Sequence, residues 1–151
     1  MVVLWTSDLN TGIEVIDNQH KRIVDYINQL EDAIQQLNRL PVGKLLDELV
    51  DYTVSHFAFE ESLQEEAGYE LATLHKAVHD RFAKRVAKYQ ERHNAGEDIA
   101  IELHGMLNTW LVHHIKRDDM AYVAEVKANI LGIISDREKK KDGGLFERFF
   151  K

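Results

Sequence analysis

Apolar residues recur along the chain every three or four positions, in four stretches of about 20 residues. This spacing places them on one face of an α-helix. Pro41 favours the start of the second helix, because proline is tolerated in the first helical turn, and Gly68 and Gly96 mark the ends of the second and third. Four such helices joined by short connections predict an all-α, up-down-up-down four-helix bundle.

The stripes expected to face the core contain polar side chains at several positions. These are His20, His56, Glu60, His75, His79 and His114. A single histidine on an apolar face is usually a hydrogen-bonded core residue. An unpaired buried polar group costs about 1–3 kcal/mol, and an unpaired buried carboxylate costs far more, so this many in one bundle need a shared partner. Metal ions are such a partner, since imidazole and carboxylate are common ligands.

The spacing within the second and third helices supports a metal site. His56 and Glu60 are four residues apart, as are His75 and His79, so each pair lies on one helix face and can bind one centre. Di-iron bundles of the ferritin type use Glu-x-x-His motifs and several glutamates. The segments here, HFAFE and HKAVH, are instead rich in histidine. The candidate ligands are too many for one ion and suit two.

Composition excludes other classes of function. The chain has 151 residues, with 26 Asp+Glu against 19 Lys+Arg and a formal net charge of −7, which argues against a nucleic-acid partner. Cysteine is absent, which excludes disulfides, thiolate zinc sites and iron–sulfur clusters. No signal segment and no apolar run near the ~20 residues of a membrane span is found. We therefore expect a cytoplasmic protein.

Four motifs occur in order along residues 3 to about 122: GIEVIDNQH ending at His20, HFAFEE from His56, HKAVH from His75, and WLVHHIKRDD from Trp110. With these motifs the sequence resembles the hemerythrin family in its bacterial single-domain form. The resemblance implies a centre of two iron ions joined by an oxo or hydroxo bridge.

The resemblance also implies a role for each ligand. His20 and His56 would bind one iron, and His75, His79 and His114 the other. Glu60 and Asp119 would bridge the two. If both ions are octahedral, one position stays vacant on the iron bound by only two histidines. In the family this is where dioxygen binds.

Two adjacent pairs, His113–His114 and Asp118–Asp119, pose a question of orientation, because neighbours on an α-helix point about 100° apart. His114 continues the helical stripe, so we expect His113 at the surface. Helical phase selects Asp118, four residues after His114, whereas the family motif selects Asp119. We follow the motif, which requires the backbone to depart from a regular α-helix before Asp119.

The resemblance implies an apolar oxygen pocket, to which we assign Trp110, Leu111 and Ile115. The predicted function is reversible dioxygen binding, as a carrier, store or sensor, and not an enzyme. Two alternatives stay open: a di-iron oxidase, peroxidase or nitric-oxide-handling enzyme using the same ligands, and an iron store. Turnover with a reductant would identify the former, and binding far above two ions per chain the latter.

The sequence beyond the bundle differs in character. We predict a hemerythrin-like domain over residues 1–135 and a C-terminal extension over 136–151. The extension joins a charged run, a Gly-Gly pair and three phenylalanines. A solvated linker is the simpler interpretation. The alternative is a docking segment for a protein partner or a membrane surface.

Overall fold

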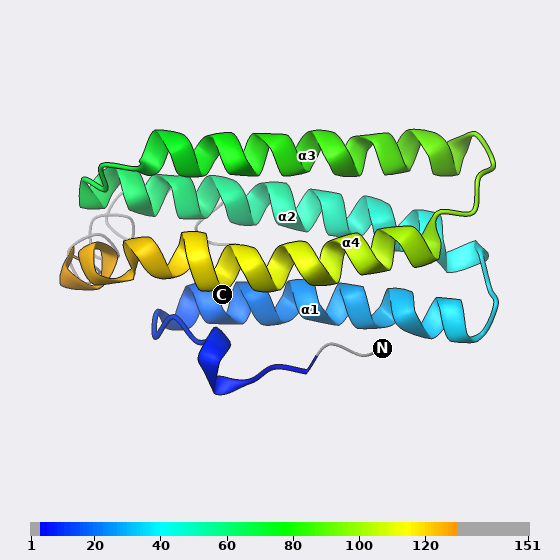
Figure 1. Ribbon diagram of the computed structural model, residues 1–151, viewed down its shortest axis with the longest axis horizontal. Coiled ribbons are helices and arrows are strands. Elements are labelled where there is room, and N and C mark those ends of the chain that lie inside the picture. Colours follow the sequence, from blue (N-terminus) through cyan, green and yellow to red (C-terminus); the bar gives the residue numbers. More distant parts are fainter. Residues whose placement is uncertain (1–3, 130–151) are drawn as a thin grey trace, which may run out of the picture.

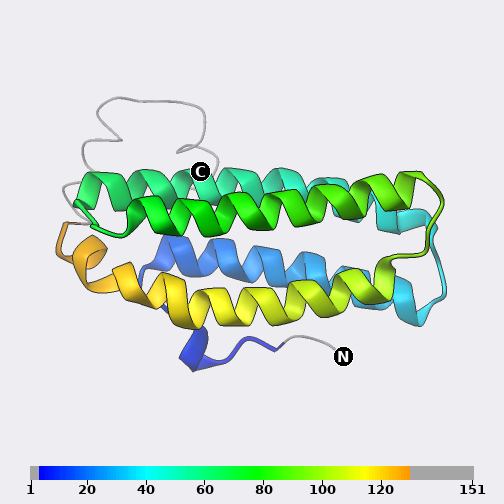
Figure 2. The same ribbon diagram turned by 45° about the horizontal axis from the view of Figure 1, so that its top comes forward.

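The computed structural model describes residues 4–129, and its regular structure is helical throughout. Four long helices follow the order α1 (Glu14–Gln35), α2 (Leu40–Ala67), α3 (Ala72–Asn94) and α4 (Ala100–His113). Figures 1 and 2 show them side by side and antiparallel, with the α2–α3 connection at one end of the bundle and the other two connections at the opposite end. The predicted four-helix bundle is confirmed. The expected boundary at residue 135 and the extension lie outside the described residues.

Three short elements flank α1 and α4 in the half of the bundle that carries the α2–α3 connection. η1 (Ser7–Leu9) precedes α1, while a π-helical turn, η2 (His114–Asp119), and a 3-10 turn, η3 (Met120–Tyr122), follow α4 directly. Residues 123–129 are again α-helical. No described helix has an apolar stretch long enough to cross a lipid bilayer.

The start of α1 is anchored by Asp17, a buried residue in its first turns. One carboxylate oxygen accepts hydrogen bonds from the backbone N–H and the hydroxyl of Thr11, both at 2.8 Å, and the other accepts from the N–H of Gly12 at 3.1 Å. Thr11 and Gly12 precede the helix, so the Asp17 carboxylate holds the incoming segment against the first turn of α1.

Two separate clusters of buried apolar side chains form the core. The larger contains Ile23 of α1 and Leu111 of α4, and the smaller contains Ile16 of α1 and Tyr122 of η3. In α1 the polar His20 lies between residues of the two clusters. Later in the chain Asp119 does the same. A polar layer therefore crosses the bundle between two apolar regions, and α1, α2, α3 and η2 contribute to it.

Two glycines test the assigned backbone conformations. Gly68 caps the helix in the left-handed conformation, with φ of 73°, whereas Gly105 lies exposed inside α4, where an added Cβ would meet open space. We expect Gly68→Ala to destabilise the fold by about 1 kcal/mol and Gly105→Ala to stabilise it by about 0.5–1 kcal/mol. Urea unfolding of both variants measures this. Equal shifts in the same direction would contradict the assigned conformations.

Candidate metal centre

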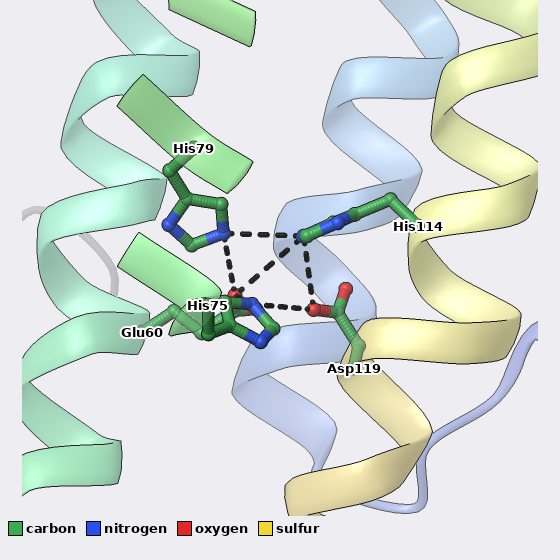
Figure 3. Close-up of side chains that lie close together, drawn as sticks. All are labelled: Glu60, His75, His79, His114 and Asp119. Atoms are coloured by element: carbon green, nitrogen blue, oxygen red, sulfur yellow. Dashed lines mark hydrogen bonds and ion pairs between the residues drawn. The ribbon is translucent and has the colours of Figure 1, made fainter. Parts of the chain in front are cut away.

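The polar layer brings together every ligand expected from the sequence. Figure 3 shows Glu60 of α2, His75 and His79 of α3, and His114 and Asp119 beyond α4 pointing toward one another. Their ligand atoms all lie within 4.8 Å of one another, and so do those of a second group that shares Glu60 and adds two histidines, His20 and His56. All of these side chains are buried.

Glu60 faces the two groups with different oxygens. Its Oε1 lies 2.7 Å from His75 Nε2 and 3.0 Å from His79 Nε2. Its Oε2 lies 3.5 Å from His56 Nε2 and 3.9 Å from His20 Nε2. The carboxylate thus has one oxygen for each group, which is the arrangement that a carboxylate bridging two ions requires.

Asp119 divides its oxygens in the same way. Its Oδ1 lies 3.1 Å from the Nε2 atoms of both His75 and His114, and its Oδ2 lies 3.0 Å from His20 Nε2. Each of the histidines therefore turns the same ring atom, Nε2, toward the two carboxylates. Two carboxylates and five imidazoles enclose one small volume between the helices.

The π-helical turn explains how Asp119 reaches this volume. On a regular α-helix a residue five positions after His114 would point well away from it, but the wider turn over His114–Asp119 brings Asp119 back to the same side. Asp119 is fully buried and His113 is exposed, as expected. Asp118 contacts the cluster from outside, where its Oδ2 accepts a hydrogen bond from His114 Nδ1 at 2.9 Å.

Three further side chains contact the cluster from outside. Glu61 Oε2 accepts a hydrogen bond from His79 Nδ1 at 2.8 Å, and the amide oxygen of Gln19 accepts one from His56 Nδ1. The buried phenol of Tyr122 donates to Glu60 Oε2 at 3.0 Å. Burial and the nearby carboxylates Glu60 and Asp119 raise the Tyr122 pKa, so the phenol keeps its proton.

The sequence analysis did not identify these outer contacts. Gln19, Glu61 and Asp118 each neighbour a predicted ligand in the sequence, but on an isolated helix they point away from it. Each contacts a histidine on another helix or one turn away. For Asp118 the four-residue spacing from His114 was a signal. For Gln19 and Glu61 the only signal was that a histidine bound to metal usually donates its second ring N–H to a carboxylate, carbonyl or water.

The contacts within the cluster bring together donor atoms that metal ions can bind. His79 Nε2 and His114 Nε2 are 3.1 Å apart, although each ring directs its Nδ1 at a carboxylate. With the ring protons on Nδ1, both Nε2 atoms carry lone pairs, which a metal ion or a further proton can occupy. Both oxygens of Asp119 and both ring nitrogens of His20 are buried without a hydrogen bond. Nitrogen and carboxylate donors of this kind suit iron.

The electrostatics differ between the two groups. Burial lowers the pKa of His114, but the charge of Asp119 and the hydrogen bond to Asp118 outweigh it and raise this pKa to about 10. For His75, burial is likewise outweighed by Asp119 and Glu60, which raise the pKa to about 9. For His56, burial dominates and lowers the pKa to about 3. The carboxylates therefore attract positive charge most strongly on the side of His75 and His114.

An apolar cavity adjoins the cluster at His20, His56 and His114. Trp110 and Leu111 line it, as expected, whereas the buried Ile115 is absent from its lining. The sequence analysis did not assign the other lining residues, which are Ile23, Ile27, Leu49, Thr53, Phe57, Phe82 and Leu107. They come from all four helices, so periodicity marks them as core but does not indicate that they share a cavity.

Known proteins of one family are similar to this chain. Residues 11–126 match the model of the hemerythrin HHE cation binding domain. A bacteriohemerythrin of Stenotrophomonas maltophilia is 50% identical over 152 residues, covering 99% of this chain and 98% of the relative. One of Pseudomonas aeruginosa is 48% identical over 149 residues, covering 99% and 95%.

The fold is also shared with a solved structure. A wild-type hemerythrin crystal structure superposes with a TM-score of 0.78 at 34% identity, covering 83% of this chain and 98% of the other. The matched segment 11–126 contains every ligand candidate of the polar layer. By its fold, its histidine and carboxylate cluster and its sequence, the chain belongs to the hemerythrin family.

Proposed function

We propose that this chain binds dioxygen reversibly at a non-haem di-iron centre. The observation that carries the proposal is the division of Glu60 and Asp119, each of which turns one oxygen to each histidine group. The proposed ligands of one iron are His20 and His56, those of the other are His75, His79 and His114, and the two carboxylates bridge. Iron bound there supplies reversible redox chemistry and an attachment point for dioxygen.

The protein's own residues hold and protect this centre. The Tyr122 phenol and the outer acceptors Glu61 and Asp118 fix the orientations of Glu60, His79 and His114. A ligand whose orientation is fixed before binding loses less freedom when it binds.

The lining of the cavity suits a small apolar ligand. Among its lining residues the imidazoles, the Trp110 indole and the Thr53 hydroxyl are the polar groups, and no Lys, Arg, Asp or Glu takes part. A cavity of this kind admits a diatomic gas, offers little to a charged organic substrate, and resists penetration by water and anions. This favours a carrier or store over a di-iron oxidase or peroxidase.

The test is an anaerobic titration with dioxygen on protein of measured iron content. We expect two iron ions per chain, one dioxygen bound per pair, and recovery of the original ferrous spectrum when the gas is removed. Consumption of dioxygen on first contact, or repeated turnover with a reductant, would replace the carrier by an oxidase or peroxidase. Iron far above two ions per chain would indicate a store.

A neighbouring pair of histidines provides the matched control. His114→Ala removes a proposed ligand and should lower iron content and abolish dioxygen binding. His113→Ala changes the exposed neighbour and should leave both at the wild-type level. Loss of iron in both variants would mean that the defect lies in the helix and not in the ligand.

The cavity gives a second prediction. Leu111→Asn places a polar amide in the cavity wall without removing a ligand, so it should draw water in and speed oxidation of the ferrous protein severalfold while iron content stays unchanged. Ile101→Asn, at an exposed site on the same helix, is the control. The absorbance of the ferric centre against time measures the rate. Equal rates in Leu111→Asn and wild type would show that this wall does not protect the site.

A further inference from the structure

The outer partners of the imidazoles differ in charge between the two proposed metal positions. At the three-histidine position (His75, His79, His114), two rings donate to carboxylates: His79 to Glu61 at 2.8 Å and His114 to Asp118 at 2.9 Å. At the two-histidine position (His20, His56), His56 donates to the neutral amide oxygen of Gln19. The Nδ1 atom of His20 is buried and has no hydrogen-bond partner.

This difference affects how strongly each ring binds a cation. A carboxylate behind an imidazole N–H stabilises positive charge on the ring and makes its other nitrogen a stronger donor, and loss of such a partner typically lowers metal affinity about 10- to 100-fold. A neutral amide holds the ring in position but adds no negative charge. Gln19 is 1% exposed, so solvent does not screen the effect.

The two-histidine position, whose outer partner is neutral, is also the one that adjoins the cavity. Both rings of the two-histidine position line it, together with His114 from the other position. The two-histidine position therefore combines fewer imidazoles, weaker outer partners and direct contact with the space through which a ligand approaches.

We propose that the chain holds its two metal ions unequally, and that Gln19, Glu61 and Asp118 act as positioning residues that set the difference. Because Gln19 is neutral, the ion beside the cavity exchanges faster. Glu61 and Asp118 slow the exchange of the other ion. This rests on the proposed di-iron function. Fewer histidines alone would also weaken the two-histidine position, so only changes to the outer partners separate the two explanations.

The experiment follows release of ferrous iron from the fully loaded protein, without oxygen, into a chromogenic ferrous chelator. The wild type should release one ion quickly and one slowly. Gln19→Glu places a carboxylate behind His56 and should slow the fast phase about tenfold, without changing the slow one. Glu61→Gln and Asp118→Asn should each speed the slow phase about tenfold, without changing the fast one.

Two controls account for charge alone. Gln36→Glu adds the same charge at an exposed site at the end of α1, and Glu65→Gln removes one at an exposed site of α2. Neither should change either phase. Thermal unfolding of each metal-free variant confirms that it folds. Glu61 and Asp118 are partly exposed, so their variants decide the question even if a buried glutamate at position 19 prevents folding.

The outcomes separate this inference from the proposed function. Release of both ions at one rate, or outer-partner variants whose two phases match those of the wild type, would overturn it. Variants that change both phases equally would also overturn it, because they would show general loosening of the bundle. A wild-type chain that binds no iron would instead refute the proposed function.

Discussion

Two buried carboxylates and five imidazole Nε2 atoms meet inside one bundle, and the stability of the fold depends on what neutralises them. The imidazoles of His20, His75 and His114 lie 3.0–3.1 Å from the Asp119 oxygens, and the facing Nε2 atoms of His79 and His114 lie 3.1 Å apart. A buried anion without a partner is expensive. Cations bound among these groups would offset that cost, so we expect metal binding to be coupled to folding.

The arrangement of the helices follows from this constraint. Apolar clusters above and below keep water from the polar layer, where electrostatic attraction is therefore stronger. The backbone leaves regular α-helical geometry over His114–Asp119, where it must turn both His114 and Asp119 inward. A π-helical turn is rare, and such turns are frequent at functional sites. Here the turn runs from one proposed ligand to the other, and it allows both to point inward.

Helical periodicity was sufficient to predict the bundle and the inward direction of His20, His56, Glu60 and His114, because each continues an apolar stripe. It was not sufficient for Asp119, since phase alone favours Asp118. Only the motif indicated the change in backbone geometry. The structure shows that both aspartates serve the site, one among the candidate ligands and one behind His114. The outer contacts were beyond the reach of the sequence for a different reason. Whether Gln19 meets His56 depends on how α1 and α2 are rotated against each other, which no local pattern specifies.

The most direct test is thermal unfolding of the chain as ferrous iron is added to the metal-free protein without oxygen. If cations neutralise the polar layer, the midpoint should rise with each addition and stop rising at two ions per chain, because binding to the folded state alone stabilises it. A midpoint that does not change with iron would show that the layer is stable without metal, and would contradict the coupling of metal binding to folding.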